Sequence, residues 1–198
     1  MNVSDRGVLV LILITAFLFS ACNNPQTAEN NKTDPTAVKT SPNAADAPFD
    51  LQFLDTMIVH HQVAIDMAKM CPGKAQHPEL LTFANSIAAA QQDEITKMKQ
   101  WRDEWFAAKP SAMNADMPGM NESMKEMDLN TLGSLTGNAF DLEFLRQMIP
   151  HHTGALLMAN AAVQKAEKNE TKILAADILK TQSAEIRQMK EWQKAWSK

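Results

Sequence analysis

The sequence predicts an all-α protein, a four-helix bundle made of two repeated helical hairpins. Apolar residues recur every three or four positions along four long stretches, which is the spacing of one helix face. Glycine and proline separate these stretches. Residues 91 positions apart also match, from His60 and His151 through to Trp105 and Trp196. Because one hairpin cannot bury its apolar face alone, we expect the two hairpins to pack together with approximate two-fold symmetry.

The first hairpin begins where the large apolar residues begin. Asp46 and Pro48 mark the start of its first helix, and Pro72-Gly73 ends that helix. The second helix starts at His77-Pro78-Glu79, because proline suits the first helical turn, and Lys109-Pro110 closes it.

The second hairpin follows a long connection over residues 107–139, which three glycines interrupt. Its first helix is predicted from about Phe140 to Lys168, and its second from about Glu170 to Trp196. Residues 49–198 therefore form the bundle with its connection.

Residues 1–21 are typical of a bacterial signal peptide of the lipoprotein type. Arg6 precedes an apolar run from Val8 to Phe19, which is too short to span a membrane. The segment ends in Leu-Phe-Ser-Ala before Cys22, which resembles a lipobox, so we expect Cys22 to carry a lipid. Plain cleavage and a retained anchor are the alternatives. Residues 22–48 are rich in Asn, Thr, Pro and Ala and are predicted to form a disordered tether.

The charge of the chain excludes one class of partner. The net charge is −4, and no block of lysine and arginine is present that would neutralise phosphates. A nucleic-acid partner is therefore not expected.

Two closely similar stretches hold four of the five histidines. They are FDLQFLDTMIVHHQVAIDMA (49–68) and FDLEFLRQMIPHHTGALLMA (140–159). A methionine lies one turn before each histidine pair, and another follows two turns later. Imidazole and thioether both bind Cu(I), and imidazole also binds Cu(II) and Zn(II), whereas hard cations prefer oxygen. The candidate metal ligands in these stretches are Met57, His60, His61, Met67, Met148, His151, His152 and Met158.

The second helix of each hairpin adds polar residues to the same region. Gln91 and Glu94 lie on its apolar stripe, and Gln182 and Glu185 repeat them. A glutamate inside a bundle is costly unless it is paired, and a histidine of the facing helix is the expected partner. Glu94 is expected either to orient His61 through a hydrogen bond or to bind the metal directly. The candidate set is completed by Glu94, Met98, Glu185 and Met189.

A metal-free interpretation of these residues stays open. Methionine commonly fills irregular parts of a core, and a buried histidine–glutamate hydrogen bond needs no metal. Histidine pairs beside methionine, present twice, are harder to explain by packing, so metal binding is favoured. One shared site and two separate sites both agree with the pattern.

The connection is a second candidate site. Its methionines follow the pattern M-x3-M-x2-M-x3-M-x2-M among Asn, Asp, Gly and Pro. Thioethers in a flexible segment can bind Cu(I) or Ag(I), whereas a capping helix packed on the bundle is the alternative. The residues concerned are Met113, Met117, Met120, Met124 and Met127.

These motifs resemble those of the DUF305 family over about Phe49 to Trp196. The resemblance rests on FL-x2-MI-x-HH and on Q-x2-EI-x2-MK-x-W, each of which occurs twice. It implies a ferritin-like four-helix bundle, and some family members are periplasmic copper-binding proteins linked to copper resistance. Thr153 departs from the glutamine that often follows the histidine pair, whereas Gln62 keeps it.

The expected function is therefore binding of Cu(I), with silver as a second cargo, for sequestration or transfer in copper homeostasis or resistance. We expect a protein of the bacterial cell envelope, periplasmic or at the outer membrane or surface, held by a lipid on Cys22. An envelope copper-handling protein is the partner class that this role implies, and no enzymatic activity is expected.

Two other functions compete with this one. The first is a metal-free structural or interaction protein of the envelope. The second is a ferritin-like di-metal oxidase, which normally needs Glu-x-x-His motifs. The residues three positions before the histidines are instead Met57, Ile58, Met148 and Ile149, which argues against the oxidase.

Overall fold

The structure is a computed structural model that describes residues 38–198. The predicted signal peptide, Cys22 and most of the predicted tether lie outside these residues. The described chain forms four long helices and, within the connection, two short ones. The long helices are α1 (Phe49–Ala68), α2 (Pro78–Phe106), α5 (Gly137–Lys165) and α6 (Asn169–Trp196), and the short ones are α3 (Met120–Lys125) and α4 (Leu129–Ser134).

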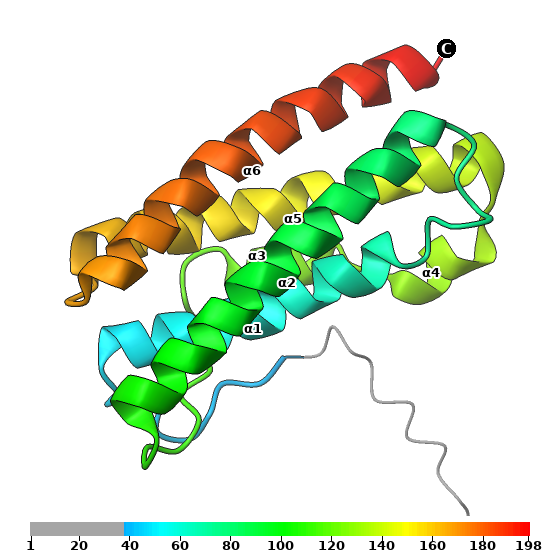
Figure 1. Ribbon diagram of the computed structural model, residues 1–198. Coiled ribbons are helices and arrows are strands. Elements are labelled where there is room, and N and C mark those ends of the chain that lie inside the picture. The colour runs from blue at the N-terminus through cyan, green and yellow to red at the C-terminus, as the bar shows by residue number, and fades with distance from the viewer. Residues whose placement is uncertain (1–37) are drawn as a thin grey trace, which may run out of the picture. The chain divides into compact units, whose positions relative to one another are not determined.

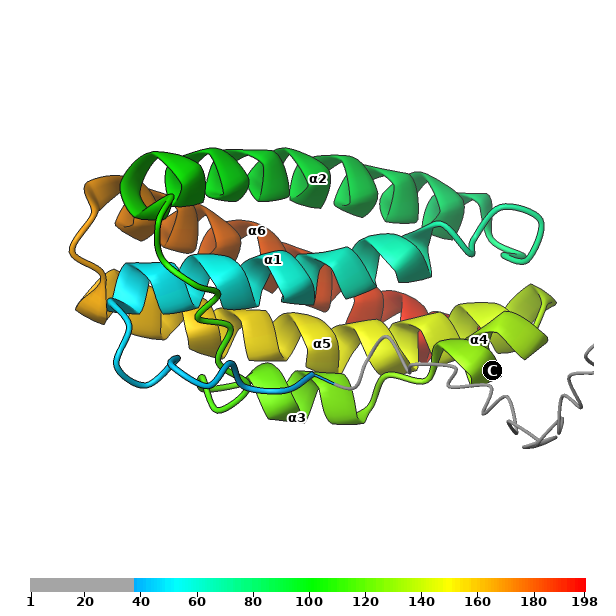
Figure 2. The same ribbon diagram turned by 90° about the horizontal axis from the view of Figure 1, so that it is seen from below.

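The four long helices form a bundle of two hairpins, as the sequence predicts (Figure 1). α1 packs against α2, and α5 packs against α6. The hairpins meet where α1 lies beside α5, and α3 packs on α5 (Figure 2). Because α2, α5 and the connection surround α1, most of its residues are buried, and Phe53, Phe140 and Phe144 fill the core between the hairpins.

The turn between α5 and α6 differs from the prediction. The expected helix extended to Lys168, but α5 ends at Lys165 and Ala166 is extended. The carboxylate of Asp50, in the first turn of α1, accepts hydrogen bonds from the backbone N–H groups of Glu167 and Lys168 at 2.8 and 3.2 Å. These bonds satisfy N–H groups at the start of α6 and stop α5 three residues early.

At the opposite end of the bundle, Asp141 repeats the contacts of Asp50, which lies 91 positions earlier. The carboxylate of Asp141, in α5, accepts hydrogen bonds from the backbone N–H groups of Gln76 and His77, at the start of α2. The His77 ring also contacts Asp141 and stacks on Trp196, whereas Lys168 lies over the ring of Trp105. Each hairpin therefore caps the second helix of the other through Asp50 or Asp141, and we call these contacts the cross-hairpin caps.

The connection lies along the bundle and is held by hydrogen bonds to α1. The Asp55 carboxylate accepts a bond from the backbone N–H of Ala112 and another from Arg102. Farther along, Gly119 and Gly154 approach so closely that a Cβ on Gly154 would overlap the carbonyl oxygen of Gly119. Gly119 also has φ of 92°, which favours glycine. These contacts bring α3 onto α5.

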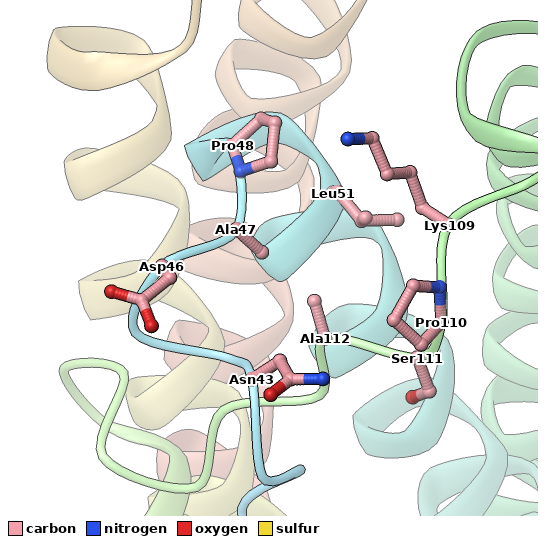
Figure 3. Close-up of a pocket in the computed structure, with 9 residues that line it drawn as sticks. All are labelled: Asn43, Asp46, Ala47, Pro48, Leu51, Lys109, Pro110, Ser111 and Ala112. Carbon is pink, nitrogen blue, oxygen red and sulfur yellow. The ribbon is translucent and has the colours of Figure 1, made fainter.

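Residues 38–48, which the sequence assigns to the disordered tether, lie against the connection instead. The backbone N–H of Ser41 donates to the carbonyl oxygen of Met113 at 2.7 Å, and Ala44 is fully buried. Figure 3 shows Asp46 and Pro48 on one side of a cavity of about 170 Å³ and Pro110 on the other. The sequence predicts a disordered tether because the segment has few large apolar residues. Hydrogen bonds supply much of its contact with the connection instead. None of the helices within residues 38–198 has a stretch long and apolar enough to cross a membrane.

Loss of either cross-hairpin cap should destabilise the fold. Asp50→Ala and Asp141→Ala each leave backbone N–H groups at a helix start without an acceptor, so the free energy of unfolding should fall by roughly 1–3 kcal/mol. Urea denaturation followed by circular dichroism measures this change. Asp66→Ala, at a partly exposed position of α1 outside the caps, is the control. Equal stability of all three variants would contradict the role of the caps.

Candidate metal centre

Helices α1 and α5 bring the two histidine pairs into a single cluster. The rings of His60 and His151 stack with centroids 3.7 Å apart and an interplanar angle of 27°. The ring of His61 lies 6.2 Å from His60, and that of His152 lies 6.1 Å from His151. All four side chains are fully buried. The two repeated motifs therefore meet in one place, which we call the histidine cluster.

A glutamate from the facing helix binds the outer histidine on each side. Nε2 of His61 lies 2.6 Å from Oε2 of Glu94 in α2, and Nε2 of His152 lies 2.9 Å from Oε2 of Glu185 in α6. The hydrogen bond expected between Glu94 and His61 is thus present, and it has a counterpart in the second hairpin. When each Nε2 donates its hydrogen to the carboxylate, Nδ1 keeps the lone pair that a metal requires.

The remaining imidazole nitrogens have no partner. Nδ1 of His61 and His152, and both ring nitrogens of His60 and His151, are buried without a hydrogen bond. Leaving a buried polar group unpaired costs about 1–3 kcal/mol. Six such atoms in one cluster are unusual in a folded core, where polar groups are nearly always paired. A cation among the rings would take up the free lone pairs.

Burial also keeps the inner pair of the cluster, the stacked His60 and His151, neutral. Desolvation lowers the pKa of His60 and of His151 well below 6.5, and the neighbouring imidazoles lower both further. Two protonated rings stacked at this distance would repel strongly. Neutral imidazole is the form that donates to a metal ion.

The six methionines of the predicted ligand set in the long helices are fully buried in the core. Met57 and Met148 lie one helical turn before the stacked histidines, on the same side of α1 and α5. Among residues 38–198, no group of three or more His, Cys, Asp or Glu side chains is arranged to hold a metal ion. By helical spacing, the further donors next to the histidines are the thioethers of Met57 and Met148, which suit soft cations. The buried residues are Met57, Met67, Met98, Met148, Met158 and Met189.

The structure packs the methionines of the connection into the core. Met120 is fully buried in α3, and Met117, Met124 and Met127 are at least 95% buried. Met113 alone of the five is only partly buried. This arrangement agrees with the capping alternative, because these side chains fill the space between the connection and the bundle.

Two glutamines that the sequence places on the inner face with Glu94 and Glu185, but not in the ligand set, are buried. These are Gln91 and Gln182, and Oε1 of each has no hydrogen-bond partner. Each lies one turn before the glutamate that binds a histidine. Their helical spacing to Glu94 and Glu185 is the sequence signal that places them on the inner face.

Fold and site together define a class of protein: a four-helix bundle of two hairpins that encloses a histidine–methionine cluster bounded by two glutamates. Residues 50–193 match the family model described as "Domain of unknown function (DUF305)". The chain belongs to the DUF305 family.

Solved structures share the fold. CopM in the Cu(I)-bound form is 42% identical, with a TM-score of 0.64, and the match covers 74% of this chain and 96% of CopM. CopM has also been solved in Cu(II)-bound and Ag-bound forms. A DUF305 protein of Streptomyces coelicolor, described as a candidate secreted protein, is 29% identical with a TM-score of 0.64, covering 76% of this chain and 94% of its own.

A curated relative matches a shorter region. The uncharacterized protein L153 of Acanthamoeba polyphaga mimivirus is 38% identical over 55 residues, which are 28% of this chain and 36% of the viral protein. The match thus spans about a third of that relative.

Acid should destabilise the metal-free protein through His60 and His151. Both are neutral when folded, because their pKa is lowered, but they take up protons near pH 6.5 in the unfolded chain. The unfolded state therefore binds more protons below about pH 6.5, and the free energy of unfolding falls there by up to about 1.4 kcal/mol per pH unit for each histidine. Urea denaturation of metal-free protein between about pH 7 and about pH 5 measures this slope.

The control for this prediction is the double variant His60→Leu/His151→Leu. Leucine fills a similar volume and does not titrate, so most of the slope in this pH range should disappear. An unchanged slope in the double variant would assign the acid sensitivity to other groups.

Proposed function

We propose that this protein binds Cu(I) in the bacterial cell envelope and sequesters it or passes it on in copper homeostasis or resistance. Silver, as Ag(I), is a second cargo of the same site because it has similar ligand preferences. The ligands come from the histidine cluster and the methionines around it.

One observation carries this proposal. The histidine cluster contains six buried imidazole nitrogens without partners, at a contact that joins the two hairpins. A metal-free scaffold would gain stability from replacing such groups by apolar ones of the same shape. Each neutral inner ring keeps one N–H, so up to four of the six nitrogens offer a lone pair, and a cation in the cluster during function would explain why these are unpaired.

The donor chemistry selects the cation. Neutral imidazole and thioether favour Cu(I) and Ag(I), whereas Mg²⁺ and Ca²⁺ require several oxygen ligands. Glu94 and Glu185 are hydrogen-bonded to histidines, so we assign them to orienting those rings. The Cu(I)-, Cu(II)- and Ag-bound forms of CopM, at 42–43% identity, support the same class of ion for this chain.

We further propose a storage or transfer role rather than catalysis, because ligand exchange at a copper site needs neither a nucleophile nor a general base. The protein would act outside the cytoplasm, anchored by a lipid on Cys22, and would exchange copper with an envelope copper-handling protein. The secreted character assigned to the Streptomyces coelicolor relative supports an extracytoplasmic location.

Removing the inner histidines should weaken copper binding. His60→Ala/His151→Ala deletes the stacked pair, so the Kd for Cu(I) should rise at least about tenfold. Competition with bathocuproine disulfonate under anaerobic conditions measures this Kd. The control is Asp66→Ala, at a partly exposed position of α1 outside both the caps and the cluster. No Cu(I) binding by the unmodified protein above a non-specific control would leave the metal-free scaffold as its function.

Replacing methionines should show whether the metal ligands lie in the core or in the connection. A variant with leucine at all five connection positions retains apolar packing, so its Kd for Cu(I) should change less than about twofold. Met57→Leu/Met148→Leu, beside the histidines, should weaken binding by more than that. The two variants are compared in the same competition titration. The opposite order of effects would move the metal site into the connection, at Met113, Met117, Met120, Met124 and Met127.

A further inference from the structure

Helices α2 and α6 leave an open groove between them. Close packing joins α1 to α2, α1 to α5 and α5 to α6, whereas α2 and α6 face each other without comparable contact. The larger half of this groove has a volume of about 570 Å³. We call it the Glu185 groove. It is lined by Glu79, Thr82, Phe83 and Ser86 from α2 and by Ala184, Glu185, Gln188 and Trp192 from α6.

Glu185 connects this groove to the histidine cluster. Its side chain is 15% exposed and lines the groove, while its Oε2 is hydrogen-bonded to Nε2 of the fully buried His152. The other ring nitrogen of His152, Nδ1, is buried and has no partner. A single carboxylate therefore lies between the groove and an imidazole of the cluster.

The walls of the groove suit a cation. The carboxylates of Glu79 and Glu185 are both negative, and no lysine or arginine is among the lining residues. The rings of Phe83 and Trp192 meet edge to face, with centroids 5.1 Å apart. The faces of aromatic rings attract cations, and desolvation strengthens that attraction.

The other half of the groove is smaller and differs in charge. Its volume is about 230 Å³, and it is also lined by two carboxylates, Glu170 and Asp177, but it has Lys97 where the Glu185 groove has Gln188. Glu94, the counterpart of Glu185, is 18% exposed but does not line either half of the groove. The two ends of the histidine cluster thus differ in their access from the groove.

We propose that the Glu185 groove is the route by which Cu(I) or Ag(I) enters the bundle, and that Glu185 is the first ligand the ion meets before the buried imidazoles. This inference rests on the proposed function. Moving a hydrated cation directly into an apolar core is costly. If the carboxylate of Glu185 replaces part of the water shell first, and imidazole replaces the rest, the ion never enters the core without ligands.

A matched pair of variants tests the route. Thr82 in the Glu185 groove and Ile173 in the smaller half are 91 positions apart, exposed and uncharged. Thr82→Phe narrows the proposed route, so the association rate constant for Ag(I) should fall by about tenfold or more. Ile173→Phe should leave that rate constant unchanged. Stopped-flow quenching of tryptophan fluorescence in chloride-free buffer measures the rate constant, because neither variant changes a tryptophan.

A second pair tests the charge of the groove. Glu79 and Glu170 lie in the first turns of α2 and α6 and line opposite halves of the groove. Glu79→Gln should lower the association rate constant by about twofold or more at low salt, with a smaller effect at high salt. Glu170→Gln should change it less than Glu79→Gln does.

Equilibrium and kinetic results separate the two proposals. The Kd for Ag(I), measured by competition, should be the same for Thr82→Phe, Ile173→Phe and the unmodified protein. If the unmodified protein binds no Ag(I), the proposed function fails. If all three bind equally tightly and associate equally fast, the proposed function stands and the entry route is overturned. Equal slowing by Thr82→Phe and Ile173→Phe would also overturn it.

Discussion

The stacked pair His60–His151 is the contact on which the rest of the structure depends. It lies where α1 meets α5, with ring centroids 3.7 Å apart, so the interface between the hairpins passes through two imidazoles. Two charged rings could not share this position, and burial lowers the pKa of both well below 6.5. The fold therefore requires neutral histidines at its centre. Neutral histidines are also the form that offers lone pairs to a soft cation.

The contacts farther out hold this pair in place. Asp50 and Asp141 join the hairpins at opposite ends, because each carboxylate caps a helix of the other hairpin. Glu94 and Glu185 fix the rings of His61 and His152 through Nε2. A site whose ligands come from different helices needs such support, because a displacement of the rings by a fraction of an ångström weakens metal binding. The groups that stabilise the bundle thus also preorganise the histidine cluster.

Local patterns in the sequence predict much of this arrangement, and contacts between distant segments account for the rest. Helical spacing and the 91-residue repeat predict the bundle. The position of Glu94 on the inward-facing stripe predicts its bond to His61, although the structure leaves the Glu94 side chain 18% exposed. The stacking of His60 on His151 depends on how far one hairpin is shifted along the other, which no local pattern encodes. For the same reason, the end of α5 at Lys165 follows from Asp50, which lies more than 110 residues earlier in the chain.

The two hairpins are alike at the residues of the histidine cluster and differ at residues that line the groove. Every candidate ligand in the cluster is identical in the two repeats, from Met57 and Met148 to Met98 and Met189. Five of the eight residues that line the Glu185 groove differ from their counterparts in the other repeat: Thr82, for example, corresponds to Ile173. A symmetric cluster needs equal ligands from both hairpins, but an ion needs only one way in. Under the proposed entry route, a closed second half would shield the buried nitrogens from water while exchange continued through the Glu185 groove. The divergence of the repeats at the groove, together with their identity at the cluster, is the pattern expected of a site that must hold a metal ion tightly and still exchange it.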